Sequence, residues 1–185
     1  MSVLVVILVV VAVIILGVLV AAAFTATEYK IERQVIINKP KSDVFNYVKL
    51  LKNQDYYSKW VMTDPNMKKE FRGTDGTVGF IYAWDSYNKQ VGKGEQEIIN
   101  ITDGERIDCE VRFMKPFVGK SITSFLTEIL EGNETQVTWI FNGRRNFVAK
   151  IVHLLFNLKK MLGRDMEISL DRLKHNLEKI NLNAL

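Results

Sequence analysis

The chain has 185 residues, of which 48% are apolar and 25% charged, and its formal net charge is +4. Acidic and basic residues are interspersed and no basic run exceeds two residues, so the composition excludes an extended nucleic-acid footprint. Cys109 is the only cysteine, which excludes an intrachain disulfide. The average composition hides two different segments, because every charged residue lies after residue 27.

The first segment is typical of a membrane anchor. Val3 to Phe24 contains no charged residue, and about 20 apolar residues are enough for a helix to cross the hydrocarbon core of a bilayer. We therefore interpret residues 1–27 as a single-pass transmembrane anchor, with the lipid bilayer as its partner. Two alternatives stay open, namely a signal peptide cleaved near Ala21–Ala23 and a buried core helix.

The charges that flank this span predict its orientation. Lys30, Arg33, Lys39 and Lys41 follow the span, and no lysine or arginine precedes it. By the positive-inside rule, this asymmetry places the remaining domain, residues 28–185, in the cytoplasm. About four residues separate the span from the first predicted strand, a tether of at most roughly 14 Å. We therefore expect the domain to lie close to the bilayer.

The second segment begins with a strand and a helix. Apolar and polar residues alternate from Tyr29 to Ile37, which predicts a half-buried strand. Pro40 suits the first turn of a short helix that extends toward Leu51. A turn at Gly73–Gly76 leads to a predicted strand from Val78 to Trp84, with three aromatic rings on one face.

The middle of the chain is a run of predicted strands with short turns. Residues 98–101, 107–113, 125–129 and 137–141 have strand patterns, and the clearest alternation is that of residues 107–113. Connections this short cannot cross over to make a parallel pair, so the strands are predicted to be antiparallel.

The last long segment predicts one amphipathic helix from Phe147 to Ile180. Its apolar residues recur at steps of three and four with charged residues between them, and roughly 33 residues give a helix about 50 Å long. The predicted fold is therefore α+β, with a curved antiparallel sheet of about six to seven strands around a long C-terminal helix.

Several short motifs resemble those of a known superfamily. They are Glu32–Pro40 followed by Val44, Phe45 and Trp60; residues 73–79 with Trp84 and residues 92–94; residues 135–139; and residues 163–167 with Leu170, Leu173 and Lys174. With the order of the elements, they resemble the SRPBCC superfamily, in particular its polyketide cyclase/dehydrase-like branch, which is related to START lipid-transfer domains. The resemblance implies the helix-grip fold and a hydrophobic ligand between sheet and helix. Some members are cyclases or hydratases, and motifs this diffuse support no single activity.

In a helix-grip arrangement, inward-facing side chains line whatever cavity remains between sheet and helix, and otherwise they fill the core. The candidate ligand-binding residues are Phe80, Tyr82, Trp84, Phe113, Trp139, Phe141, Leu155, Leu162 and Met166. Gly163, midway along the predicted helix, indicates close packing, room for a ligand or a tolerated kink.

The candidate catalytic residues are Arg33, Tyr82 and Glu95. Arg33 falls on the apolar side of its strand, where a charge needs a carboxylate partner, a polar ligand group or access to solvent, and we favour the last two. Glu95 and Glu97 share one strand face and form either an acid/base pair or, more commonly, paired carboxylates on an outer sheet face.

Metal and cofactor chemistry find no support in the sequence. His153, His175 and Cys109 lie far apart, so no metal-ligand spacing is present, and we expect neither a metal nor a cofactor. Cys109 is interpreted as a small core residue because it falls on an apolar strand face.

Three functions remain at this point. The leading hypothesis is membrane-anchored binding of a hydrophobic small molecule or lipid in a cavity between sheet and helix. The alternatives are a polyketide cyclase/dehydrase-like enzyme that uses acid/base residues in that cavity, and a non-catalytic interaction module with a filled core. The sequence leaves protein partners unknown.

The N-terminal half of the predicted long helix adds one expectation. From Phe147 to Leu162 it carries more apolar residues than one stripe needs, including Leu154 and Phe156. We expect this half to touch the membrane surface and to gate the ligand, unless loops and the early helices cover it.

Overall fold

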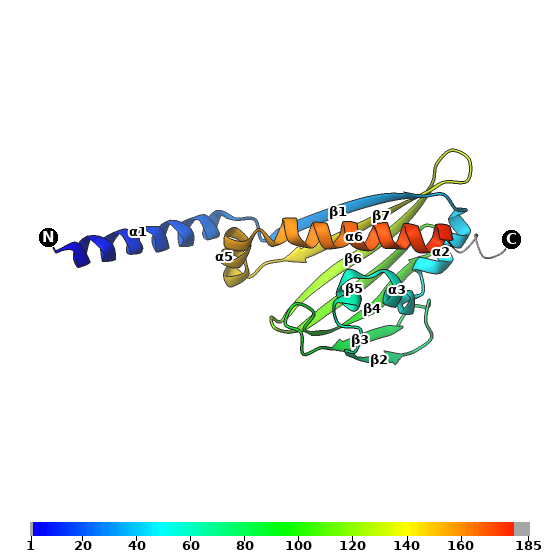
Figure 1. The fold of residues 1–185 in the computed structure, drawn as a ribbon, viewed down its shortest axis with the longest axis horizontal. Helices are drawn as coiled ribbons and strands as arrows, with labels where there is room; N and C mark the ends of the chain where they lie inside the picture. Colours follow the sequence, from blue (N-terminus) through cyan, green and yellow to red (C-terminus); the bar gives the residue numbers. More distant parts are fainter. Residues whose placement is uncertain (1, 180–185) are drawn as a thin grey trace.

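The computed structural model describes residues 2–179, apart from the side chains of residue 148 and of residues 153–156. A single antiparallel sheet of seven strands curves around the long helix α6 (Leu158–Lys179), and the apolar helix α1 (Val3–Phe24) extends away from the domain (Figure 1). The predicted α+β helix-grip fold is thereby confirmed.

Helix α1 has a surface unlike that of the domain. Its 22 residues are long and apolar enough to cross a bilayer, a property that a signal sequence near an amino terminus shares. None of its most apolar stretch is buried. Three residues then lead from Phe24 to the first strand at Glu28, so the domain follows the helix almost at once.

The strands pair with their neighbours along the order β1-β7-β6-β5-β4-β3-β2. Their bounds are β1 (Glu28–Ile37), β2 (Lys68–Arg72), β3 (Ile81–Asp85), β4 (Lys93–Thr102), β5 (Arg106–Lys115), β6 (Gly119–Ile129) and β7 (Thr135–Arg144). The face that carries Ile31, Val111 and Trp139 is turned toward α6, and we call it the inner face.

The register divides the sheet into two ends. Glu28 at the start of β1 pairs with Arg144, and Phe113 near the end of β5 pairs with Gly119. The turns at residues 86–92 and 116–118 therefore lie at the end of the sheet where α1 arrives, which we call the anchor end. The turns at residues 103–105 and 130–134 lie at the opposite end, the far end.

Short helices fill the space between β1 and β2. They are α2 (Lys41–Val48), the 3₁₀ turn η1 (Leu51–Asn53), α3 (Gln54–Tyr57) and α4 (Lys59–Thr63). The Asp75 carboxylate accepts the backbone N–H of Leu51 at 2.8 Å and that of Lys52 at 3.1 Å. Asp75 thereby satisfies donors at the start of η1 that the helix itself cannot pair.

The prediction of one unbroken helix from Phe147 to Ile180 is wrong. The helix ends at Phe156, Asn157 takes a positive φ of 45°, and α6 begins at Leu158. Asparagine tolerates this left-handed conformation better than most residues. The first piece, α5 (Phe147–Phe156), turns across the anchor end and lies against α1 (Figure 1).

Two strand predictions also need correction. The strand predicted from Val78 begins only at Ile81, because Gly79 has a φ of 88° that ends any extended run before it. Val78 is 60% exposed. Strand β2 was missed, since Phe71 is its only apolar residue, and the strand predicted from Phe125 is the second half of β6.

Candidate functional site

A cavity of about 440 Å³ lies between the inner face of the sheet and the helices. Its walls come from β3–β7 on one side and from α3, α4, α5 and the first turn of α6 on the other. The turn at residues 116–118 and Arg144 border it at the anchor end. The cavity therefore opens toward the end of the sheet that receives α1.

Aromatic rings form the middle of the cavity wall. Trp139 stacks on Phe125 with ring centroids 4.6 Å apart and meets Trp60 edge-on at 5.9 Å. Trp84 meets Phe113 edge-on at 6.4 Å. Because such pairs hold rings in fixed orientations, the wall is preformed and largely apolar.

The indole N–H donors of Trp84 and Trp139 already have partners within the protein. The Trp139 Nε1–H donates to Thr123 Oγ1 at 2.6 Å, and the Trp84 Nε1–H donates to the Val91 carbonyl at 3.3 Å. The indole donors of Trp84 and Trp139 are therefore bound within the protein, and both rings line the cavity.

The end of the cavity away from the mouth is polar. Gln54 on α3 and Gln96 on β4 line it, and Gln54 Nε2 donates to Gln96 Oε1 at 3.3 Å. Both side chains are buried, at 9% and 8% exposed. Gln96 also interacts with the thiol of Cys109, whose pKa burial raises to about 12. Two amides carry four N–H donors, more than these contacts use.

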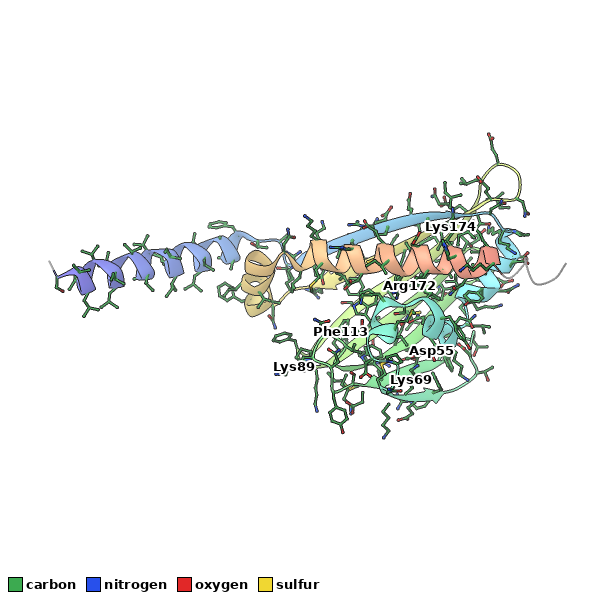
Figure 2. All side chains as sticks on the ribbon, viewed as in Figure 1. Asp55, Lys69, Lys89, Phe113, Arg172 and Lys174 are labelled. Atoms are coloured by element: carbon green, nitrogen blue, oxygen red, sulfur yellow. The ribbon has the colours of Figure 1, made fainter. Side chains whose placement is uncertain are left out.

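A second polar cluster lies where β2 and β3 meet α3. The Tyr82 hydroxyl donates to Asp55 Oδ1 at 2.6 Å, and Lys69 Nζ pairs with Asp55 Oδ2 at 2.8 Å. Figure 2 shows Asp55 and Lys69 on facing elements. Burial and the bond to Asp55 raise the pKa of Tyr82, so the phenol stays protonated at neutral pH.

Most of the predicted ligand-binding residues lie together in the cavity lining. They are Tyr82, Trp84, Phe113, Trp139, Phe141 and Leu162. Phe80 and Met166 do not line it: Phe80 is packed under Phe71 with ring centroids 6.3 Å apart, and Met166 is fully buried in the core. The side chain of Leu155 lies outside the described residues. Contact with a ligand stays a prediction for all nine.

Arg33 faces α6 and forms an ion pair with a carboxylate there. Its Nε lies 2.5 Å from Glu167 Oε1, and Nη1 donates to the Glu32 carbonyl at 2.7 Å. Of the three alternatives considered from the sequence, the structure shows the carboxylate partner, which we did not favour; the Arg33 side chain is also 33% exposed, so it keeps access to solvent. A polar ligand group stays a prediction. A Cβ at Gly163 would lie 2.3 Å from Arg33 Nη2, so this glycine makes room for the arginine.

Glu95 lies on the outer face of the sheet, away from the cavity. It accepts from Arg112 Nε at 2.7 Å and also pairs with Arg72. Burial alone would raise the pKa of Glu95, but the bonds to Arg112 and Arg72 hold it below its usual range. The three candidate catalytic residues therefore lie in three different places, and only Tyr82 reaches the cavity.

Among residues 2–179 with described side chains, no group of three or more His, Cys, Asp or Glu residues is placed to hold a metal ion. The side chain of His153 is outside this set, so its part in any site stays untested. His175 is exposed on α6.

Comparisons of the whole fold find similar solved structures. A protein of unknown function from Staphylococcus aureus is 14% identical with a TM-score of 0.62, over 84% of this chain and 96% of that one. The di-domain ARO/CYC BexL from the BE-7585A biosynthetic pathway is 14% identical with a TM-score of 0.61, over 85% of this chain and 52% of that one.

The Aha1 dimer from Colwellia psychrerythraea is 13% identical with a TM-score of 0.57, over 81% of this chain and 96% of that one. The domain has the helix-grip fold. These structures share the fold that the SRPBCC resemblance implied, and identities this low carry no further. No family model and no curated protein matches this chain.

Several cavity-lining residues escaped the sequence analysis, among them Gln54 and Gln96 at the inner end and Trp60 and Val111 on the walls. Gln96 was detectable, because it falls between Gly94 and Ile98 on the inner side of a strand whose outer side carries glutamates. Gln54 gave no comparable signal, since its four-residue helix is too short for a periodic pattern. A polar residue at an inward strand position is the sign that was overlooked.

Proposed function

We propose that the protein is a membrane-anchored binding protein for one amphipathic small molecule or lipid. The observation that carries this proposal is the preformed cavity of about 440 Å³ with aromatic walls and a buried glutamine pair at its inner end. Small-molecule sites typically have volumes of about 300–1,000 Å³ and are mostly apolar with a few placed polar groups.

The glutamine pair indicates the kind of polar group that the ligand carries. A buried amide without a partner costs about 1–3 kcal/mol, and Gln54 and Gln96 use only part of their hydrogen-bonding capacity. An ester or ketone oxygen reaching the inner end would accept a hydrogen bond there, and a hydroxyl would accept or donate one, without bringing a charge into an apolar space. We therefore expect a ligand with a neutral polar group at its inner end.

The cavity mouth has a different chemistry. Lys115, Lys120 and Arg144 border it, so the outer part of the ligand meets cations and solvent. An elongated molecule that is apolar in the middle and polar at both ends matches this sequence of surroundings. The likeness to ARO/CYC proteins supports a site for a compact organic molecule in this fold.

Tyr82 supports the enzymatic alternative. Its hydroxyl is held by Asp55, which is held in turn by Lys69, and the ring lines the cavity. A protonated phenol is able to donate a hydrogen bond to a substrate carbonyl after reorientation, as acid catalysis requires. Tyr82→Phe separates the two functions, because a binding protein would keep its ligand in this variant and an enzyme would accumulate unconverted substrate.

Native mass spectrometry of the full chain, extracted gently from its own membrane, tests the proposal. We expect one retained molecule per chain. Val111→Trp, which places an indole in the cavity, should remove it, whereas Ile99→Trp at an exposed position of the same strand pair should keep it. If wild type and Val111→Trp each appear only at the mass of their own ligand-free chain, the result would contradict binding.

The orientation of the anchor stays a prediction. A reporter fused after Leu185 should be active in the cytoplasm if the positive charges that follow α1 decide the topology. Reporter activity on the other side of the membrane would show that the domain and its ligand lie outside the cytoplasm.

A further inference from the structure

The anchor end of the domain exposes large apolar side chains on two neighbouring turns. In the turn between β5 and β6, Phe117 is 69% exposed and Val118 is 84% exposed. Tyr87, in the turn between β3 and β4, is fully exposed. Exposing such apolar side chains to water is unfavourable, so these turn tips favour an apolar surrounding.

The sheet register fixes where these turns point. Strand β1 starts at the anchor end, three residues after α1, and its pairing with β7 carries the register through β6 to β5 and β4. The tips at residues 86–92 and 116–118 therefore project from the same end of the domain as α1. In Figure 2, Lys89 and Phe113 lie on the side of the domain toward α5 and α1.

Charge is distributed along the same axis. Residues 86–94 and 113–120 contain four lysines, Lys89, Lys93, Lys115 and Lys120, and no aspartate or glutamate. Residues 142–164, which include α5, are also free of acidic residues. Two far-end turns are the reverse, because residues 103–105 and 128–134 contain no lysine or arginine and carry the carboxylates of Asp103, Glu105, Glu128, Glu131 and Glu134. The third far-end turn, which follows β1, carries Lys39 and Lys41.

Apolar tips surrounded by lysines suit the interface of an anionic bilayer. There the rings enter the boundary between headgroups and acyl chains while the ammonium groups meet lipid phosphates. The position of α1 selects this occupant over a protein partner. The segment between Phe24 and Glu28 is at most about 14 Å long, so a spanning α1 holds the apolar, lysine-bearing turns near the lipid and the turns at residues 103–105 and 130–134 away from it.

We infer that the turns at residues 86–92 and 116–118 form a second membrane contact, in which Phe117, Val118 and Tyr87 insert into the leaflet that α1 leaves. The mouth of the cavity then opens onto lipid, and a ligand passes between bilayer and cavity without crossing water. This inference rests on the proposed membrane anchor.

Fluorescent labelling at matched positions tests it. The full chain carries a single cysteine, Cys109, which is completely buried. A dye on Val118→Cys therefore reports on the anchor end, and a dye on Ile129→Cys, at a position 68% exposed, reports on the far end. Each chain is reconstituted in vesicles of equal parts phosphatidylcholine and phosphatidylglycerol.

We expect the dye at position 118 to be quenched by spin-labelled lipid and to be about threefold less accessible to aqueous iodide than the dye at position 129. Equal iodide access at the two positions in chains that float with the vesicles would overturn the inference and leave the anchor intact. Shielding from iodide without quenching by lipid would also overturn it, because a second protein copy would then cover the turn.

Failure of the proposed anchor gives a separate result. Chains whose α1 does not span the bilayer would fail to float with the vesicles after an alkaline wash, whatever the dye reports. Lys89→Gln with Lys115→Gln should weaken lipid quenching at position 118, whereas Glu131→Gln with Glu134→Gln at the far end should leave it unchanged.

Discussion

The two halves of the inner sheet face differ in how they are covered. Toward the far end, Ile37, Ile98, Ile107 and Val137 are at most 1% exposed and pack in a closed core. Toward the anchor end, equally apolar strands end in a cavity, where Phe113 is only partly buried. The sheet is continuous through both halves, so the strands alone do not decide where space remains.

The helices above the sheet account for the difference. Over the far half, α6 covers the sheet with the buried side chains of Leu170, Leu173 and Leu177. The backbone N–H of Lys59 donates to Ser169 Oγ at 2.9 Å, and Lys174 Nζ donates to the Ile36 carbonyl at 2.8 Å. Over the anchor half, the helix is interrupted at residue 157 and α5 turns away. A cavity therefore remains where the covering helix changes direction.

Trp139→Ala is expected to have the largest effect, because this ring belongs to both halves. It stacks on Phe125 in the core and also lines the cavity. Removing a buried tryptophan typically costs about 3–5 kcal/mol of unfolding free energy, and ligand retention should fall as well. Chemical denaturation together with native mass spectrometry measures both. A loss below about 1 kcal/mol would mean that the ring is not part of the core.

Leu173→Ala and Phe113→Ala should separate the two halves. Leu173 is completely buried under the far half, so its truncation should cost about 2–5 kcal/mol and leave ligand retention intact in the folded fraction. Phe113 already borders empty space, so its truncation should cost less than half as much and reduce ligand retention. The reverse pattern would assign the binding site to the far half.

The sequence predicted the fold well because the fold depends on repeated local patterns. The alternation of apolar and polar residues in β5 and the apolar stripe of α6 each extend over many residues. The interruption at Asn157 escaped because a single left-handed residue leaves the apolar spacing unchanged. The excess of apolar residues between Phe147 and Leu162 was its indirect sign.

The candidate site was harder to predict for a physical reason. An inward aromatic residue has the same pattern whether it fills a core, as Phe80 does, or borders a cavity, as Phe113 does. Arg33 likewise has the pattern of a ligand contact, and only the position of Glu167 on a helix far along the chain settles its partner. Whether an inward residue fills the core or borders a cavity, and which partner a charge has, depends on packing between distant segments. The periodicity of the sequence carries no information about that packing.

Gly163→Ala should reveal the fit between α6 and β1. Alanine gains about 1 kcal/mol of helix propensity over glycine, but the new Cβ would collide with the Arg33 guanidinium. We expect the two effects to offset each other nearly in the wild-type background. In Arg33→Ala the full gain should appear, so a double-mutant cycle should give a coupling of about 1 kcal/mol. Additive effects would show that Arg33 is free to move away.

Arg112→Met should give a smaller, pH-dependent effect on the outer face. Arg112 bridges Glu95, Glu97 and Glu110 at 2.7 Å each, and its pairing holds the pKa of Glu95 and Glu110 below the usual value. Their contribution to stability is therefore complete above pH 4.5 and is lost as pH falls through the lowered pKa values. These pairs are partly exposed and therefore screened by solvent, so we expect about 1 kcal/mol at neutral pH.

Urea denaturation at several pH values checks this sign. The gap in unfolding free energy between wild type and Arg112→Met should narrow as pH falls below about 4. A gap that widens in acid would mean that the carboxylates are not stabilised by Arg112.

Crosslinking to a photoactivatable fatty alcohol shows whether the anchor half of the inner face holds an amphipathic molecule. The full chain is reconstituted in vesicles with the probe, irradiated, and mapped by peptide mass. We expect crosslinks at Trp84, Val111 and Phe113, which line the cavity, and none at the closed far-half residues Ile98 and Val137. Crosslinks confined to α1, or equal at both halves, would contradict this expectation.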